Sequence, residues 1–119
     1  MAVVLVVEDE PNIAEVTAEI LEQLNHDVRL AATAAEAVAF VKTERPDAIL
    51  LDIILPDGRG TVVLDQLHTL RPDVPIVMVT ANADEDLARE TLRHGAVDYV
   101  MKPFEIAQLT RVIEAALAS

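Results

Sequence analysis

The chain has 119 residues, of which 52% are apolar, and its 21 acidic side chains against nine basic ones give a formal net charge of −12. This length suits one buried core, so we expect residues 1–119 to form a single domain. The absence of cysteine excludes disulfides and thiol chemistry. The acidic balance disfavours direct nucleic-acid binding and favours cations or basic partner surfaces, although it equally fits a role in solubility alone.

The length of the apolar runs indicates whether the chain could cross a membrane. Runs such as residues 2–7 and 48–51 are far shorter than the ~20 residues that cross a bilayer, so we expect no membrane span. The segment before Glu8 has no basic region and no small-residue cleavage site, which does not fit a secretory signal. We therefore expect a cytoplasmic location.

Short apolar runs alternate with stretches of helix length along the whole chain. Runs rich in Val, Ile, Leu and Ala predict buried strands, at residues 2–7, 28–31, 48–51, 76–79 and 97–101. Because a parallel strand needs a helix to return the chain, this alternation predicts an α/β fold with a five-stranded parallel sheet, doubly wound as (βα)5.

The helical stretches carry apolar faces and end signals. The predicted faces of the first and last helices consist of Ile13, Val16, Ile20 and Leu24, and of Ile106, Leu109, Ile113 and Leu117. Pro11 fits a first helical turn, and Thr33 with Glu36 has the spacing of a capping box. Asp84 is expected to cap the fourth helix, and Gly95 to end it.

A polar side chain follows four of the five predicted strands. Glu8 and Asp9 follow the first strand, Asp52 the third, Thr80 the fourth and Lys102 the fifth. The carboxyl ends of parallel strands lie along one edge, where open α/β sheets bind their ligands. We therefore expect these side chains to converge in one crevice.

Three carboxylates in one shallow pocket repel one another, and a hard divalent cation with oxygen ligands relieves that repulsion. Mg²⁺ fits best, with Mn²⁺ as the alternative. A carboxylate beside such an ion can attack a phosphoryl group, because phosphoryl transfer needs an aligned nucleophile and positive charge around the equatorial oxygens. Lys102 supplies a second positive centre, and the Thr80 hydroxyl can donate a hydrogen bond to a phosphoryl oxygen.

The residues at these strand ends resemble the response-regulator receiver family of bacterial two-component signalling. The matching pieces are Glu8-Asp9, Leu51-Asp52-Ile53-Ile54-Leu55-Pro56, Thr80-Ala81 and Asp98-Tyr99-Val100-Met101-Lys102-Pro103-Phe104. Each piece is weak alone, but four pieces in order along the whole chain are specific. The resemblance implies one receiver domain over residues 1–119, with the flavodoxin-like strand order 2-1-3-4-5.

By this resemblance, Asp52 accepts a phosphoryl group from a sensor histidine kinase or a phosphotransfer protein in a Mg²⁺-dependent reaction. Asp9 is then a direct metal ligand, Glu8 a metal-side carboxylate acting through water, and the Ile54 carbonyl the backbone ligand. The family is a class of signalling domains rather than enzymes, and its chemistry is limited to self-catalysed phosphotransfer and slow autodephosphorylation.

The resemblance also assigns a switch. Lys102 pairs with the phosphoryl group, while Thr80 and Tyr99 change the surface around the fourth helix, the fifth strand and the fifth helix, although an aromatic at residue 99 equally fits plain core packing. Family members often dimerise through this face, and their Lys102–Pro103 bond is often cis. The last helix is expected to end near Ala118, so the chain is either a single-domain regulator that docks on a target protein or part of a longer regulator or hybrid kinase.

The sequence departs from the family pattern at one position, and two other functions remain as alternatives. The segment 57–60 places Arg59 where the family usually has a small or acidic residue. A pseudo-receiver docking module would work without phosphorylation, although every required side chain is present. A haloacid-dehalogenase-like phosphatase needs a second aspartate at position 54, which is Ile54 here. His26, His68 and His94 are expected to be solvated, because no pair has the close spacing of metal ligands.

Overall fold

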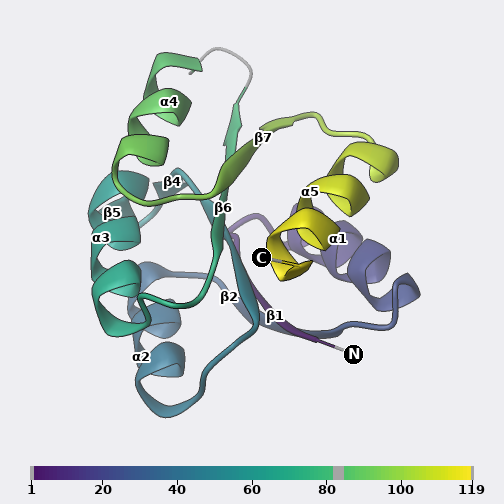
Figure 1. Ribbon diagram of the computed structural model, residues 1–119, viewed down its shortest axis with the longest axis horizontal. Coiled ribbons are helices and arrows are strands. Elements are labelled where there is room, and N and C mark those ends of the chain that lie inside the picture. The colour runs from purple at the N-terminus through teal and green to yellow at the C-terminus, as the bar shows by residue number, and fades with distance from the viewer. Residues whose placement is uncertain (1, 82–84, 119) are drawn as a thin grey trace.

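Five parallel strands form the central sheet of this computed structural model, which describes residues 2–81 and 85–118 (Figure 1). The strands are β1 (Val3–Val7), β2 (Asp27–Ala31), β3 (Ala48–Asp52), β6 (Ile76–Ala81) and β7 (Asp98–Lys102). They lie in the order β2-β1-β3-β6-β7, which is 2-1-3-4-5 when the long strands are counted along the chain. The predicted doubly wound fold is therefore confirmed.

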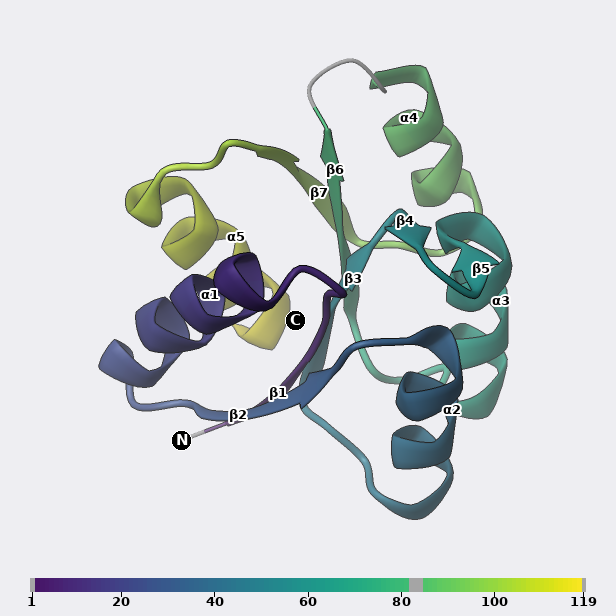
Figure 2. The same cartoon turned by 180° about the vertical axis from the view of Figure 1, so that it is seen from behind.

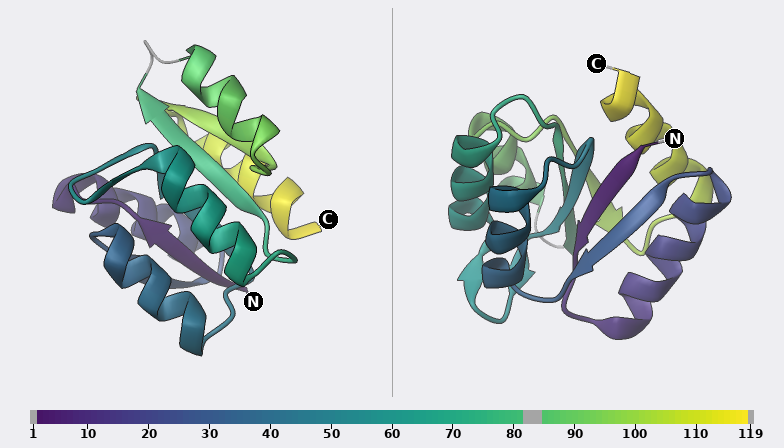
Figure 3. Two further views of the ribbon diagram at one scale, coloured as in Figure 1. Left: turned by 90° about the vertical axis from the view of Figure 1, so that its left-hand side faces the viewer. Right: turned by 90° about the horizontal axis from the view of Figure 1, so that it is seen from below.

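Five helices cover the two faces of this sheet. On one face, α1 (Pro11–Gln23) lies beside α5 (Ile106–Ala118) (Figure 2). On the other face lie α2 (Ala34–Thr43), α3 (Gly60–Leu70) and α4 (Glu85–Arg93), and the two layers flank the strands when the molecule is seen from below (Figure 3). None of the helices in the described ranges is long and apolar enough to span a membrane.

Alternate residues of each central strand point into opposite halves of the core, as the period of two in a strand requires. The half beneath α2, α3 and α4 includes Leu5, Ile49, Leu51 and Met78. The half beneath α1 and α5 includes Val4, Val6, Leu50 and Val77. This double burial explains why the strands are almost continuously apolar in the sequence.

Most of the predicted helix-end signals are confirmed. Pro11 occupies the first turn of α1, and the Thr33 side chain accepts the N–H of Glu36 at 3.1 Å. Gly95 follows α4 with a φ of +110°, a conformation that suits glycine. The cap expected at Asp84 lies outside the described residues.

The predicted apolar faces of α1 and α5 are partly wrong. Val16 is 54% exposed and Ile106 is 62% exposed, although the apolar periodicity predicts both on the core side. The residues that α1 buries are Ala14, Thr17, Ile20 and Leu21. Ile20 and Leu21 pack in the core half beneath α1 and α5, whereas Val16 lines an open groove with Phe104.

A short antiparallel hairpin, absent from the sequence prediction, follows β3. Its strands are β4 (Ile54–Leu55) and β5 (Gly58–Arg59). At its base the N–H of Gly60 donates to the Ile53 carbonyl at 2.5 Å, and a Cβ on Gly60 would lie 2.5 Å from the Ile53 Cα. Only glycine fits so close an approach, and the hairpin therefore leaves β3 through a tight backbone contact.

Candidate functional site

Strand register brings the carboxylates of the candidate site to the same height. Val7 of β1 pairs with Leu51 of β3, so Glu8 and Asp52 stand one residue beyond a matched pair. The N–H of Glu8 also donates to the Ala31 carbonyl of β2 at 2.9 Å, which extends the pairing past the end of β1. The predicted convergence of these strand ends is thus a consequence of how β1 and β3 pair.

Glu8, Asp9 and Asp52 form a compact acidic cluster. Each contributes a carboxylate oxygen, and these oxygens all lie within 4.8 Å of one another. Glu8 and Asp52 are buried, with 6% and 8% of their surface exposed, whereas Asp9 is exposed. A set of oxygen donors that is open to solvent on one side suits Mg²⁺, which binds through a few carboxylates and keeps several waters.

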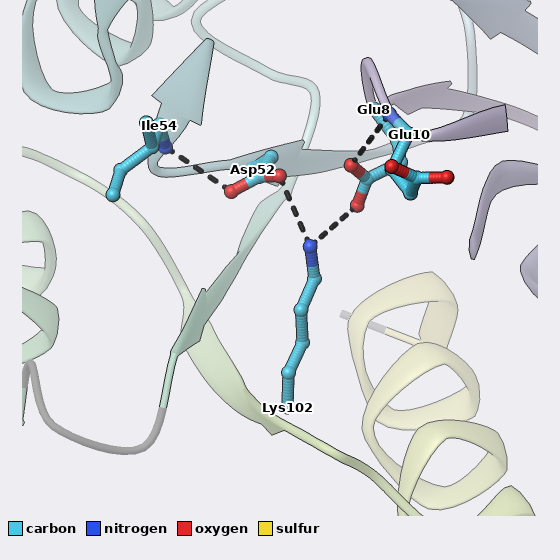
Figure 4. A network of polar contacts seen from close by, with 5 residues as sticks. All are labelled: Glu8, Glu10, Asp52, Ile54 and Lys102. Atoms are coloured by element: carbon cyan, nitrogen blue, oxygen red, sulfur yellow. Dashed lines mark hydrogen bonds and ion pairs between the residues drawn. The ribbon is translucent and has the colours of Figure 1, made fainter. Parts of the chain in front are cut away.

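Lys102, the last residue of β7, bridges two members of the cluster (Figure 4). Its Nζ donates hydrogen bonds to Glu8 Oε1 at 2.7 Å and to Asp52 Oδ2 at 3.1 Å. The Lys102–Pro103 peptide that follows is cis, the isomer that is often found in the family. The predicted second positive centre is therefore in direct contact with the predicted nucleophile.

Burial and hydrogen bonding shift the pKa values of Glu8 and Lys102 in opposite directions. Burial raises the pKa of the Glu8 carboxyl above its ordinary value, and hydrogen bonds from Lys102 and from the N–H of Glu10 offset this only in part. Burial by itself lowers the pKa of the Lys102 ammonium, but its hydrogen bonds to Glu8 and Asp52 outweigh that effect and raise it. A cation bound beside Glu8 would favour the ionised carboxylate.

The second oxygen of Asp52 holds the start of the hairpin. Asp52 Oδ1 accepts the N–H of Ile54 at 3.1 Å, which ties the residue proposed as the backbone ligand to the predicted nucleophile (Figure 4). The Ile54 side chain is exposed and faces Arg59 in the hairpin register. The unusual arginine of the loop therefore lies opposite the residue two positions beyond Asp52.

The two predicted switch residues lie on neighbouring strands. Thr80 is buried inside β6 rather than after it, opposite Met101. Tyr99 is half-buried on β7 opposite Met78 and packs against the half of the core beneath α4. Because Tyr99 and Met101 are two residues apart on one strand, Thr80 and Tyr99 share the face that α4 covers.

Two features escaped sequence reasoning. The Asp57 carboxylate accepts backbone N–H groups at the start of α2, a contact between a hairpin turn and a helix that no local pattern signals. His26 is half-buried, with 9% of its side chain exposed and Nε2 3.1 Å from Glu114 Oε1, so the expectation of a solvated histidine is wrong there. His94 is exposed, and its Nδ1 lies 3.1 Å from Asp65 Oδ1.

The fold and site define an α/β protein with an acidic cluster and a bridging lysine at the carboxyl edge of its parallel sheet, where Glu8, Asp9 and Asp52 could hold a metal ion. A family model narrows this class. The model of the response regulator receiver domain matches residues 4–114. The chain belongs to the response regulator receiver domain family.

Curated relatives and solved structures agree with this assignment. Regulatory protein LuxO of Vibrio cholerae is 38% identical over 111 residues, which are 93% of this chain and 24% of LuxO. The probable C4-dicarboxylate response regulator DctR of Priestia megaterium is 33% identical over 113 residues, which are 93% of this chain and 50% of DctR. The chain therefore spans half or less of these relatives.

Among solved structures, the receiver domain of NtrX from Brucella abortus has a TM-score of 0.94 at 34% identity and covers 98% of each chain. A CheY-like receiver domain protein from Methanospirillum hungatei has a TM-score of 0.93 at 36% identity, covering 99% of this chain and 94% of that one. The likeness thus extends over nearly the whole described fold.

Proposed function

We propose that this receiver domain accepts a phosphoryl group on Asp52 in a Mg²⁺-dependent reaction and transmits the change through the face formed by α4, β7 and α5. The observation that carries the proposal is the placement of Lys102 Nζ between Glu8 and Asp52 within a cluster of three carboxylates. Phosphoryl transfer needs positive charge and an aligned nucleophile, and this arrangement supplies both.

The donor set of the cluster fits a magnesium ion. Asp9, Asp52 and the Ile54 carbonyl would hold it directly, and Glu8 would hold it through water. When bound, the ion neutralises charge on the phosphoryl oxygens and helps align the phosphoryl group with its acceptor. Manganese, which takes similar oxygen ligands, is the alternative occupant.

The residues of the chain then have separate tasks. An Asp52 carboxylate oxygen attacks the phosphorus of a phosphohistidine or a small phosphoryl donor, and the new O–P bond forms as the bond from phosphorus to the donor breaks. Lys102 already donates to Asp52 and can transfer that hydrogen bond to a phosphoryl oxygen. Hydrolysis of the resulting acyl phosphate returns the free carboxylate, so the chain is a self-limited phosphoryl acceptor rather than an enzyme acting on other substrates.

The switch would use the two residues beneath α4. Donation from the Thr80 hydroxyl to a phosphoryl oxygen exists only in the phosphorylated state, so it biases the chain toward a second conformation. Tyr99, half-buried on the same face, would turn inward and change the surface of α4, β7 and α5. A sensor histidine kinase or a phosphotransfer protein would supply the group, and an output domain, a target protein or a second copy would read this surface.

The test is to incubate the chain with acetyl phosphate, with and without MgCl₂, and to measure the intact mass. We expect one phosphoryl adduct that requires Mg²⁺, disappears in Asp52→Ala and persists in the matched surface variant Asp73→Asn. Beryllofluoride with Mg²⁺ should shift the amide NMR signals of α4 and β7 in the wild type but not in Asp52→Ala.

Two results would replace this proposal. A wild-type chain that shows neither an adduct nor calorimetric Mg²⁺ binding at millimolar concentration would be a pseudo-receiver, which docks through its fold alone. Sustained turnover of phosphate esters would identify a phosphatase, although Ile54 stands where such an enzyme needs its general acid.

A further inference from the structure

The Asp57 carboxylate caps the start of α2, although Asp57 itself lies in the β4–β5 hairpin. Its Oδ1 accepts the N–H of Ala34 at 2.8 Å, and its Oδ2 accepts the N–H of Ala35 at 3.1 Å. The cap residue of α2, Thr33, separately accepts the N–H of Glu36. Three of the backbone donors that a helix start leaves unpaired are therefore satisfied here, two of them by a residue of the β4–β5 hairpin.

Asp57 occupies the turn of that hairpin, between Leu55 and its partner Gly58. A Cβ on Gly58 would lie 3.2 Å from a methyl of Val63 and 3.8 Å from the Ala34 Cβ, so the hairpin backbone lies close against α2 and α3. The base of the hairpin is closed by the hydrogen bond from Gly60 to Ile53. The hairpin is thus attached to the rest of the fold at both its base and its tip.

We infer that Asp57 is a positioning residue of the metal site, which holds the hairpin on α2 and thereby keeps the Ile54 carbonyl in place for the cation. The inference rests on the proposed function, in which Ile54 supplies a backbone ligand. A backbone carbonyl has no side-chain torsion with which to adjust, so its position depends entirely on the segment that carries it. Anchoring that segment removes conformational freedom that cation binding would otherwise have to remove.

The charge on Asp57 is suited to this task. The N–H groups of Ala34 and Ala35 lower the pKa of its carboxyl below the ordinary value, so it is ionised at neutral pH and accepts with both oxygens. An asparagine keeps one acceptor oxygen but turns an amide N–H₂ toward the second backbone N–H. Asp57→Asn therefore removes about half of the attachment, and Asp57→Ala removes all of it.

The test compares Mg²⁺ affinities by calorimetry for the full chain and three variants. We expect Asp57→Ala to bind Mg²⁺ about tenfold more weakly than the wild type, the lower end of the effect of losing groups that orient metal ligands. Asp57→Asn should be intermediate. Thr33→Ala is the matched control, because it also removes a cap of α2 but leaves the hairpin attached, and its Mg²⁺ affinity should equal that of the wild type.

Each outcome is informative. Wild-type affinity in both Asp57 variants, or a loss of the same size in Thr33→Ala, would overturn the inference, since helix stability alone would then account for any effect. If Asp57→Ala fails to fold, the comparison of Asp57→Asn with Thr33→Ala decides the matter by itself. A wild-type chain without Mg²⁺ binding would instead overturn the proposed function, which keeps the two failures distinguishable.

Discussion

Lys102 Nζ, at the end of β7, lies 2.7 Å from Glu8 Oε1, just beyond the end of β1, although 94 residues separate the two in sequence. The same ammonium reaches Asp52 at the end of β3. Neither β1 nor β3 pairs with β7 in the sheet. One side chain therefore links the end of β7 to the ends of β1 and β3, two paired strands to which no backbone hydrogen bond of the sheet joins it directly.

Replacement of Lys102 should destabilise the fold, because this lysine relieves the repulsion between the Glu8 and Asp52 carboxylates. We expect Lys102→Met to lower the free energy of unfolding by about 1–3 kcal/mol, because hydrogen bonds to charged groups are lost and two buried carboxylates remain. Added Mg²⁺ should raise the urea midpoint more in the variant than in the wild type, since the ion replaces the missing positive charge. Lys42→Met, at an exposed position on α2, is the control. Equal responses to Mg²⁺ would argue against a shared site.

The base of the hairpin should tolerate no side chain. Gly60→Ala would place a Cβ 2.5 Å from the Ile53 Cα and 2.6 Å from its carbonyl oxygen, so the backbone must shift. We expect a loss of about 1–3 kcal/mol in urea unfolding. Gly58→Ala is the milder comparison, because its nearest neighbour would be a side-chain methyl of Val63 at 3.2 Å. A variant of Gly60 as stable as that of Gly58 would contradict the tight contact.

Protonation of Asp57 should weaken the attachment of the hairpin to α2. The pKa of this carboxyl is lowered by two backbone N–H donors, from an ordinary value of 3.8. The stabilisation is therefore complete above that value and is lost as the pH falls through the lower pKa of the folded state. The stability difference between the wild type and Asp57→Asn should be constant from pH 7 to about 5 and shrink below pH 3.8.

Thr33→Ala provides the comparison for this pH series. It weakens the same helix, and although it also removes the hydrogen bond from the Thr33 hydroxyl to Glu36 Oε2, it loses the cap of the Glu36 N–H at every pH, so its stability difference from the wild type should persist at the acid limit. Thermal unfolding at several pH values measures all three proteins. A difference for Asp57→Asn that persists unchanged into the acid range would show that the carboxylate charge has no part in the contact.

The first helix offers a direct test of which face it buries. Val16 is exposed and Ile20 is buried, although both lie on the apolar face that the sequence predicts. We expect Val16→Ser to change stability by less than about 0.5 kcal/mol. Ile20→Ala should cost about 2–4 kcal/mol, because it leaves a cavity beneath the helix. If chemical denaturation showed comparable losses of stability for the two variants, Val16 would belong to the buried face, as the sequence predicts.

The strands could be predicted from the sequence because a strand that is buried on both faces has a nearly unbroken apolar sequence. All five runs became strands of the main sheet, with ends displaced by only a few residues, as β6 continues through Thr80 to Ala81. The polar residues at those ends were correctly expected to converge, since parallel strands share one carboxyl edge. Lys102 in contact with Asp52 is the clearest example.

Contacts that depend on how helices, strands and loops pack against one another could not be predicted from the sequence. The period of a helix identifies an apolar stripe, but which part of the stripe meets the sheet depends on how the helix docks, and Ile106 therefore stays exposed. The contact of the half-buried His26 with Glu114 of α5 has the same origin. The contact of Asp57 with Ala34 joins a hairpin turn to the start of a helix 23 positions away, a relation that carries no periodic signal.

The pairing of Val7 with Leu51 has a consequence for how such domains can vary. A slip of one residue between these strands would displace one carboxylate by about 3.3 Å and turn it to the other side of the sheet. The spacing between Asp52 and its acidic neighbours is thus set by the pairing of β1 with β3. Arg59, an exposed residue of the β4–β5 hairpin, lies outside this pairing and can therefore change without altering that spacing.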